Sequence, residues 1–331
     1  MKADNGLNMQ LHQVVEEVLS KEGERALGDA ASALSKRYRT PTIAWADLAV
    51  ASQMEALGYL AWRLPATALV LQAILRRIPQ QALPEPLRVL DLGAGPASSV
   101  PALLHTFPMD LEVHLLEEQP AMKMAGEKLL RALPLREGVR IHWQETSFAQ
   151  GPWSKADLVL ASYMVNELKD QEQEVLLQRV LAQEPAFFLL VVPGTPHHTQ
   201  GLMRMRTQAL AQGYHVLAPC TFNGPCPMEE SESWCHFSLR IQRSARLRRL
   251  KGATLAYEDE KFQYMLFSKA APEGARGRRI LRHPLVRKGA RELLLCDETG
   301  IHPLCVRKKE GERYQRAKDG GWGDVWWDEE A

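Results

Sequence analysis

The sequence predicts an α/β fold with a doubly wound, mostly parallel sheet. Short apolar runs of strand length alternate with amphipathic helical segments from residue 84 onward. One apolar run leads into a glycine-rich turn within residues 88–102, and the next ends at Glu117. A tight turn after one strand and a carboxylate after the next are typical of a nucleotide-type site at the carboxyl edge of such a sheet.

The glycine-rich turn reads RVLDLGAGPASSVPA from Arg88 to Ala102. Its glycines allow a sharp turn and let a ligand approach the main chain, and the helix that follows offers free N–H groups. The spacing D-x-G-x-G-P differs from the G-x-G-x-x-G of dinucleotide folds, so the turn alone is a weak signal. The strand Leu111–Leu116 and its Glu117 strengthen it, because such sites use a carboxylate for ribose hydroxyls. The alternative is a plain strand-to-helix turn with a surface glutamate.

Residues 1–83 are predicted to form a helical region. Apolar residues recur at helical spacing from Leu11 to Leu19, and further apolar stripes cover Trp45–Leu60 and Ala66–Ile78. Pro65 is expected to break the run between the last two segments. Such a region either covers a ligand or only completes the core.

Residues 84–274 are predicted to hold the sheet and its crossover helices. After Glu117 we expect helices over residues 121–133, 171–182 and 200–212, and strands over 139–143, 156–162, 186–192, 215–218 and 262–268. Ser162 ends one of these strands, and Asn166 and Glu167 follow it at the edge where ligands bind in doubly wound sheets. They are therefore candidates for the site, although a polar helix cap is a simpler explanation for Asn166 and Glu167.

Composition is that of an ordinary soluble protein. The chain has 331 residues, 45% of them hydrophobic, and a formal net charge of +1. No apolar run reaches the roughly 18 residues of a membrane span, so we expect no membrane partner. The N-terminus has neither an apolar signal core nor an arginine-rich transit pattern, which predicts a cytoplasmic protein. We expect a monomer.

Two basic stripes interrupt this near-neutral composition, and neither contains an acidic residue. They consist of Arg240, Arg243, Arg246, Arg248, Arg249 and Lys251, and of Arg276, Arg278, Arg279, Arg282, Arg287 and Lys288. Positive charge without neighbouring acids predicts a phosphate-backbone partner, that is, a nucleic acid. The alternative is a pair of solvated faces.

Three cysteines, Cys220, Cys226 and Cys235, lie in one loop after the strand predicted at 215–218. In a reducing compartment, clustered thiols indicate a metal or catalysis rather than disulfides. A fourth ligand would come from Cys296 or Cys305. Four thiolates suit zinc or an iron–sulfur cluster, and the C-x5-C-x8-C spacing is longer than that of zinc ribbons, which favours the cluster. The alternative is that the cysteines are buried and inert.

A metal centre in this loop is expected to be structural. A long loop within an α/β core is costly to order without a staple. The centre would fix an insertion over residues 216–250, including a basic helix expected at Leu239–Leu250, and so shape an RNA-binding surface. It would carry no electrons.

Residues 275–331 are predicted to form a small β-rich extension. Leu293–Leu295 and Pro303–Val306 flank the turn Asp297–Gly300, which predicts a hairpin. The tryptophans of GWGDVWW, Gly321–Trp327, are expected in its core, the alternative being a surface for stacking bases.

Several of these segments together resemble one family. APCTFNGPCPMEESESWCHFSLRIQRS and the strand Tyr257–Ser268 are similar to the small-ribosomal-subunit methyltransferase-like family, that of mitochondrial methyltransferase-like protein 17 and its bacterial relatives. Further similarity lies in YLAWRLPAT, DLGAGP, VVPGTP and WGD, so the resemblance spans Tyr59 to Asp324. It implies a Rossmann-like class I methyltransferase fold, an S-adenosylmethionine (SAM) site, a [4Fe–4S] cluster and action on small-subunit rRNA during assembly or translation.

The resemblance assigns two sets of residues in this sequence. The cofactor-binding set comprises Asp91, Gly93, Ala94, Gly95, Pro96, Glu117, Glu118, Ser162 and Asn166, with Glu117 on the ribose. The metal set comprises Cys220, Cys226, Cys235 and Cys296, with Cys305 the second choice for the fourth ligand and zinc the alternative metal. Related proteins are expected in the mitochondrial matrix.

Catalysis is less well marked than binding. The family's first motif usually continues G-P-G, whereas Ala97 follows Pro96 here, and its methyl group would crowd the ligand. The sequence has no N/D-P-P-Y/F tetrad and no thiol near Tyr163–Glu167, so no catalytic residue is assigned.

Three functions stay open: an rRNA methyltransferase that uses SAM, a non-catalytic small-subunit assembly or translation factor, and a small-molecule methyltransferase with a zinc staple. The basic stripes and the resemblance argue against the third.

Overall fold

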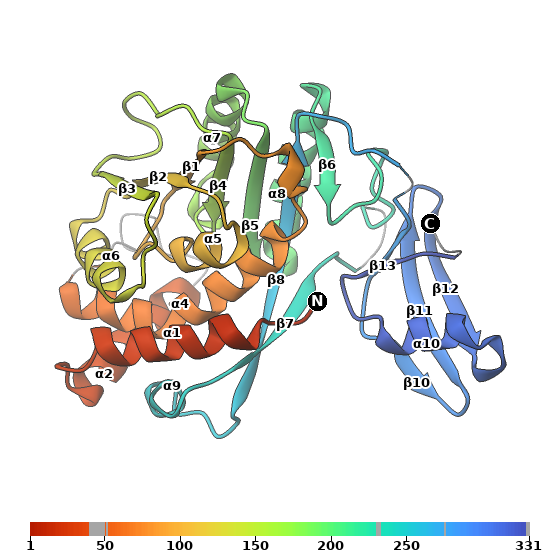
Figure 1. The fold of residues 1–331 in the computed structure, drawn as a ribbon, viewed down its shortest axis with the longest axis horizontal. Helices are drawn as coiled ribbons and strands as arrows, with labels where there is room; N and C mark the ends of the chain where they lie inside the picture. Colours follow the sequence, from red (N-terminus) through yellow and green to blue (C-terminus); the bar gives the residue numbers. More distant parts are fainter. Residues whose placement is uncertain (40–49, 51, 230–232, 275, 329–331) are drawn as a thin grey trace. The chain divides into compact units, whose positions relative to one another are not determined.

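A computed structural model of the chain describes residues 1–39, 50, 52–229, 233–274 and 276–328 (Figure 1). The chain divides into two compact units. The N-terminal unit comprises Ala3–Pro185 and Arg240–Glu260. The C-terminal unit comprises Met1–Lys2, Ala186–Leu239 and Lys261–Ala331.

A parallel sheet with the strand order β3-β2-β1-β4 forms the centre of the N-terminal unit. Its strands are β1 Leu87–Leu92, β2 Leu111–Leu116, β3 Val139–Gln144 and β4 Leu158–Ser162. The connecting helices are α5 Val100–Thr106, α6 Pro120–Ala132 and α7 Asp170–Gln183. In β1, Val89, Leu90 and Leu92 are fully buried, as expected for a parallel strand covered on both faces. The predicted doubly wound arrangement is confirmed here.

The helical region predicted before the sheet is present. It contains α1 Asn5–Val18, α2 Glu24–Arg39 and α4 Gln53–Leu75, and the 3₁₀ turn η1 Gln80–Ala82 leads to β1. Helix α4 contacts α1, α2, α5 and α6 (Figure 1). Among the described residues, α4 is the one helix long and apolar enough to cross a membrane, and 78% of its apolar window is buried inside the protein, as in a core helix. The first part of the predicted helix Trp45–Leu60 lies outside the described residues.

Pro65 does not end the helix, and the predicted break at this residue is wrong. Helix α4 continues through Pro65, which lies in its interior and is buried. Proline removes one N–H donor and crowds the carbonyl four residues earlier, which usually costs about 3 kcal/mol. The apolar residues on both sides of Pro65 are fully buried, so tertiary packing of α4 outweighs this cost.

The C-terminal unit contains strands of two sheets. In the first, β8 Tyr257–Ser268 pairs antiparallel with both β5 Phe187–Pro193 and β6 His215–Ala218, and β7 Phe237–Gln242 also pairs with β8. The 3₁₀ turn η3 Pro196–His198 and helix α8 Thr199–Ala211 follow β5.

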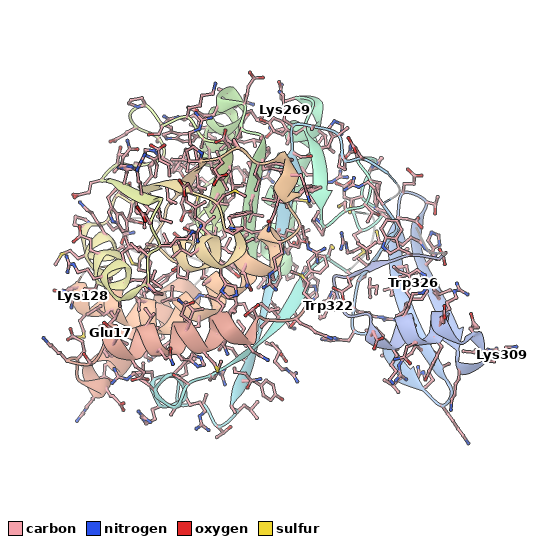
Figure 2. The ribbon with its side chains drawn as sticks, viewed as in Figure 1. Glu17, Lys128, Lys269, Lys309, Trp322 and Trp326 are labelled. Carbon is pink, nitrogen blue, oxygen red and sulfur yellow. The ribbon has the colours of Figure 1, made fainter. Side chains whose placement is uncertain are left out.

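The second sheet is the predicted β-rich extension. Its order is β10-β11-β9-β13, with β12 on β11. The elements are β9 Arg278–Ile280, β10 Leu285–Arg287, β11 Ala290–Asp297, β12 Gly300–Arg307, η4 Lys308–Glu310, α10 Glu312–Asp319 and β13 Val325–Trp326. The hairpin turn lies between Asp297 and Gly300, as predicted. Trp326 belongs to the core of this sheet, while Trp322 is half-buried (Figure 2).

The basic helix predicted at Leu239–Leu250 is wrong over its first half. Residues up to Gln242 belong to β7, where buried residues alternate with the exposed Arg240 and Gln242, and only Ala245–Leu250 forms a helix, α9. The Ser244 side chain caps α9 by accepting a hydrogen bond from the Leu247 N–H at 3.1 Å. The closely spaced arginines of this segment resemble a basic helix, whereas the period-two burial of β7 is that of a strand.

Candidate cofactor and metal sites

The turn after β1 has the backbone geometry that its glycines permit. Gly93 and Gly95 have φ values of +63° and +55°, in the left-handed region that favours glycine. A side chain at Gly93 would come within 3.0 Å of the Met164 Cβ, whereas a Cβ at Gly95 would meet no atom within 4 Å. Gly95 therefore borders open space, while Ala94 and Pro96 are buried beside it. A ligand can approach the main chain at Gly95.

Asp91 lies buried at the end of β1 and faces this turn. Its Oδ2 accepts a hydrogen bond from the Ser99 Oγ at 2.5 Å, and its buried Oδ1 has no partner among the described residues. Burial raises the pKa of Asp91 from 3.8 to about 7, against the lowering effect of the Ser99 hydrogen bond. A buried carboxylate oxygen without a donor is costly, and a ligand that donates to it would remove that cost.

Glu117, directly after β2, bridges the turn and the second strand. Its Oε2 accepts from the Gly95 N–H at 2.8 Å, and its Oε1 accepts from the Gln119 N–H at 2.9 Å. Burial raises the pKa of Glu117 to about 6, although both hydrogen bonds act in the opposite direction. The adjacent Glu118 is exposed, so of the two predicted carboxylates only Glu117 faces the turn.

The end of β4 contributes further polar groups. Ser162 is half-buried at the last position of β4, and Asn166 lies in the 3₁₀ turn η2 Val165–Glu167, where its buried Oδ1 has no partner among the described residues. Burial raises the pKa of Glu167 well above its ordinary value, and the nearby Glu117 adds to this effect. Tyr163 has a φ of +57°, which is strained for a residue with a side chain and is common at functional sites.

Ala97 also lies in the left-handed region, with a φ of +59°, and its methyl group is fully buried. The position therefore has the backbone conformation of the glycine that the family motif carries. An alanine in this conformation costs about 1 kcal/mol or more relative to the right-handed region. Because the methyl group points into the protein interior, it packs against the core.

A buried ion pair within the N-terminal unit is a feature that the sequence did not predict. Arg63 of α4 donates two hydrogen bonds to the Glu260 carboxylate, at 2.8 and 3.2 Å, and the Tyr163 hydroxyl donates to it at 3.2 Å. The two side chains are only 25% and 14% exposed. The Arg63 guanidinium also lies over the Tyr163 ring, 5.0 Å from its centroid. Their separation of 197 residues left no local signal.

Replacing Glu260 with glutamine is expected to destabilise the folded chain by about 2 kcal/mol, because it leaves the Arg63 charge largely buried without its partner. The measurement is urea unfolding followed by circular dichroism. Asp259→Asn is the matched control, since Asp259 pairs with Arg240 at the surface, where both side chains are more than a third exposed. We expect less than about 0.5 kcal/mol from the control. Equal losses in both variants would contradict the structural role of the buried pair.

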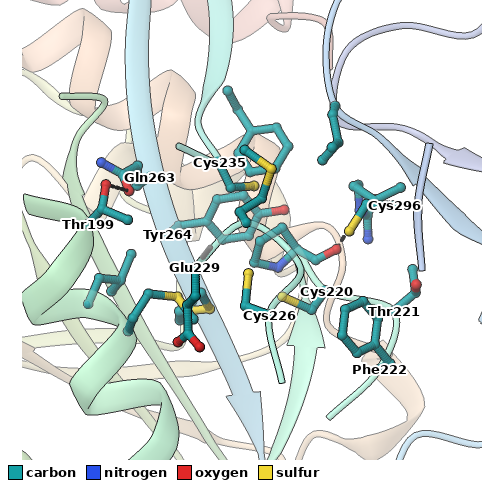
Figure 3. A pocket seen from close by; sticks show the side chains of 18 residues that line it. Thr199, Cys220, Thr221, Phe222, Cys226, Glu229, Cys235, Gln263, Tyr264 and Cys296 are labelled. Atoms are coloured by element: carbon teal, nitrogen blue, oxygen red, sulfur yellow. Dashed lines mark hydrogen bonds between the residues drawn. The ribbon is translucent and has the colours of Figure 1, made fainter. Parts of the chain in front are cut away.

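The C-terminal unit brings four cysteines together around one cavity. Cys220, Cys226, Cys235 and Cys296 line a cavity of about 60 Å³, and Figure 3 shows them there with apolar and aromatic neighbours. Burial raises the pKa values of the Cys226, Cys235 and Cys296 thiols, and the neighbouring sulfurs add to the effect at each. The value for Cys296 is about 12. Such thiols stay protonated until a cation binds them.

Of the two sequence candidates for the fourth thiol, only Cys296 lies at this cavity. Cys296 is buried on β11. Cys305 is exposed on β12, where it stands opposite Glu292 in the hairpin register and does not line the cavity. The two cysteines are nine positions apart in sequence, and the hairpin leaves Cys296 buried and Cys305 exposed.

Two arginines of the second basic stripe fix the cysteine loop. Arg276 donates hydrogen bonds to the carbonyl oxygens of Val216, Leu217 and Cys220, at 2.5 to 3.0 Å. Arg279, which lines the cavity, donates from Nε to the Pro219 carbonyl at 2.5 Å. These contacts provide hydrogen-bond donors to carbonyl oxygens at the end of β6 and the start of the cysteine loop.

The interpretation of the basic stripes as uncompensated charge is wrong for most of their residues. In the first stripe the ion pairs are Arg240–Asp259, Arg243–Glu258, Arg246–Glu16, Arg249–Glu24 and Lys251–Glu258. In the second, Arg278 pairs with Asp328 and Arg287 with Glu292. The acids come from other elements, so an inspection of each stripe by itself does not find them. The positive charge of these residues is therefore balanced within the protein.

Strand order and site together define the class of protein. The parallel order β3-β2-β1-β4, the antiparallel β8 on β5, the glycine turn after β1 and the acid after β2 are the features of the Rossmann-like class I methyltransferase fold. Residues 53–327 match the family described as "Mitochondrial small ribosomal subunit Rsm22", and the chain belongs to that family. The resemblance inferred from the sequence is thereby confirmed.

Two named proteins are similar to this chain in sequence. The Rsm22-cox11 tandem proteins 1 and 2 of Schizosaccharomyces pombe, both named as mitochondrial, are 22% identical over 289 residues, covering 72% of this chain. The match spans 38% of the length of these relatives. Their names agree with the expected mitochondrial placing of related proteins, and cytoplasmic localisation of this chain stays a prediction.

Two solved methyltransferase structures are also similar. Human N-acetylserotonin methyltransferase in complex with SAM has 14% identity and a TM-score of 0.43, covering 79% of this chain and 72% of the other. The magnesium protoporphyrin IX methyltransferase of Synechocystis with bound SAM has 13% identity and a TM-score of 0.40, covering 71% and 91%.

Proposed function

We propose that this chain binds SAM at the turn after β1 and methylates rRNA of the small ribosomal subunit. Membership of a family named for the mitochondrial small ribosomal subunit supports the partner. The observation that carries the cofactor is the buried Asp91 near the open space at Gly95, because no described residue donates a hydrogen bond to its Oδ1. Small-molecule methyltransfer with a zinc staple has no comparable support from the family.

The residues at the turn fit SAM. When bound, SAM supplies a methyl group made electrophilic by the sulfonium charge. The Glu117 carboxylate would accept hydrogen bonds from the ribose hydroxyls in place of those from the Gly95 and Gln119 N–H groups, and the released Gly95 N–H would face the ligand. Asp91 would accept a ligand donor at its free oxygen, and its charge favours a cationic ligand. Ala94, Pro96 and Ser162 would shape the walls.

The acceptor side provides positioning rather than an evident acid or base. Tyr163 is held by its hydrogen bond to Glu260, and Asn166 offers an amide oxygen that has no partner in the part of the chain that the structure describes. Orienting the acceptor nucleotide against the sulfonium methyl would supply most of the rate, because proximity alone can contribute several kcal/mol.

Transfer of labelled methyl groups from SAM to isolated small ribosomal subunits tests this function. We expect incorporation into rRNA of immature or mature particles, and none with the Asp91→Ala variant. If neither particle accepts label while the chain still binds SAM, methylation is excluded as its function.

A second function, a non-catalytic small-subunit assembly or translation factor that keeps the fold, is favoured by two observations. The segment Tyr163–Leu168 carries no catalytic tetrad, and Ala97 replaces the motif glycine. In that case the chain would bind SAM and immature particles without transferring label.

We also propose that the four cysteines bind a structural [4Fe–4S] cluster. The thiols fit because all four line one largely apolar cavity. The C-x5-C-x8-C spacing of the loop is longer than that of zinc ribbons, which favours a cluster over one zinc ion. The cluster would staple the loop 219–235 to β11.

SAM affinity is expected to increase with pH between about 5.5 and 7.5. Burial raises the pKa of Asp91 to about 7 and that of Glu117 to about 6. Between pH 4 and 7 the folded chain therefore holds protons that the unfolded chain has lost, and these groups contribute less stability as pH rises. Hydrogen-bond donors of SAM favour the ionised carboxylates, so binding releases protons and tightens by up to about tenfold per pH unit for one proton.

Calorimetry in two buffers of different ionisation enthalpy measures the dissociation constant of SAM and the number of protons released on binding. A dissociation constant that does not change with pH, together with no proton release, would contradict the assignment of these carboxylates to the site.

A further inference from the structure

A histidine-rich cluster lies in the N-terminal unit, on strands β2 and β3. Glu112 and His114 share one face of β2 because they are two positions apart, and His142 of β3 stands opposite His114 in the parallel register. One ligand atom from each side chain lies within 4.8 Å of the other two. This is the one such group among the described residues, and no residue of the SAM or cysteine sites belongs to it.

The distances suit a single ion. The Glu112 Oε1 lies 3.3 Å from the His114 Nε2 and 4.0 Å from the His142 Nε2. Ligand atoms at about 2.1 Å from one tetrahedral ion lie about 3.4 Å apart, so a small rotation of the more exposed His142 ring completes the arrangement. The two rings are stacked, with centroids 4.9 Å apart. Their side chains are 15% and 48% exposed, which leaves a path for the ion.

The surroundings orient His114 as a ligand. The Ser154 Oγ lies 3.1 Å from the His114 Nδ1, which leaves Nε2 directed at Glu112. A hydrogen bond on the second ring nitrogen is the usual support of a metal-binding histidine. The loop that carries Ser154 is itself fixed, because Arg179 donates to the Phe148 and Gly151 carbonyls.

Nearby positive charge is balanced in part. Arg88 and Arg140 are the register neighbours of Glu112 on β1 and β3. Arg88 is neutralised by Asp157, to which it donates at 2.7 and 2.9 Å. The Glu112 carboxylate balances part of the charge of a bound ion.

From this geometry we infer that Glu112, His114 and His142 bind a divalent transition-metal ion of the zinc type. Two imidazoles and one carboxylate are a ligand set that such ions prefer, and water completes the coordination. The ion would bridge β2 and the edge strand β3. Such a bridge would stabilise the pairing of β3 with β2, because β3 is the edge strand and pairs with β2 alone in the described sheet.

The test is titration of the full chain with Ni²⁺, observed through ¹³C-labelled histidine rings by NMR. The chain has ten histidines, and the paramagnetic ion is expected to broaden two of their signals before one equivalent of Ni²⁺ has been added. The two signals are assigned to His114 and His142 because each is missing from the spectrum of the corresponding alanine variant, His114→Ala or His142→Ala. Calorimetry is expected to show at least tenfold weaker Ni²⁺ binding for His142→Ala and for Glu112→Gln, which keeps the side-chain shape. His197→Ala, an exposed histidine elsewhere, is the control and should bind as the parent chain does.

The Cys226→Ser variant distinguishes Ni²⁺ binding at the histidine cluster from binding at the cysteine cavity. In this variant Ni²⁺ should still broaden the ring signals of His114 and His142. The inference is overturned if one equivalent of Ni²⁺ leaves the two signals unchanged, if all ten broaden alike, or if Glu112→Gln and His142→Ala bind as tightly as the control.

Discussion

Serine at position 296 is expected to reduce the iron content of the anaerobically purified chain from about four atoms to nearly none. Cys296 is the one proposed ligand that comes from β11, so its loss leaves the cysteine loop without its anchor. A serine hydroxyl has nearly the same size but is a much poorer ligand for iron than a thiolate. Because metal binding contributes directly to folding, thermal stability should fall together with iron content.

Cys305→Ser provides the matched control for this result. Cys305 lies on the paired strand of the same hairpin but is exposed and away from the cavity. Iron and acid-labile sulfide should stay at the parent level in this variant. The account is contradicted if Cys305→Ser loses iron and Cys296→Ser retains it, or if the parent chain carries stoichiometric zinc and no iron.

Alanine at position 117 is expected to weaken SAM binding by about 100-fold, which corresponds to about 2.7 kcal/mol. The Glu117 carboxylate is the acceptor that we propose for two ribose hydroxyls, and a hydrogen bond to a charged group contributes about 1.5–3 kcal/mol. The measurement is isothermal titration calorimetry with SAM, after circular dichroism has shown that the variant is folded.

Glu118→Ala is the control, because Glu118 is adjacent in sequence but exposed. It should bind SAM within about twofold of the parent, since an exposed carboxylate contributes little through screened charge. Similar affinity in the Glu117→Ala variant and in the parent would remove Glu117 from the site.

The sequence predicted the sheet well because its signals are local. The apolar run before Gly93, the turn itself and the acid after Leu116 all lie within short segments, and period and turn chemistry identify them. Pro65 shows where local rules fail. The cost of an interior proline is fixed, but the burial of α4 that outweighs it depends on helices that are distant in sequence.

Parts of the sites were predictable for the same reason. Cys220, Cys226 and Cys235 are close in sequence, so a metal site could be expected. The resemblance ranked Cys296 above Cys305 as the fourth ligand, and the structure places Cys296 at the cavity. The ion pair Arg63–Glu260 could not be predicted from local pattern, because its partners are far apart in the chain.

Charge was the least predictable feature. A basic stripe is visible in sequence, but the acids that neutralise it are not. Glu16 and Glu24, for example, come from the N-terminal helical region and pair with Arg246 and Arg249. The histidine cluster was invisible for a similar reason, since only the register of β2 and β3 places His114 opposite His142.

Anomalous diffraction from anaerobically grown crystals, recorded at the iron and zinc absorption edges, tests the central claim most directly. The account predicts a compact group of iron peaks within bonding distance of the Sγ atoms of Cys220, Cys226, Cys235 and Cys296. A single zinc peak there, or an empty site with the four sulfurs apart, would contradict it.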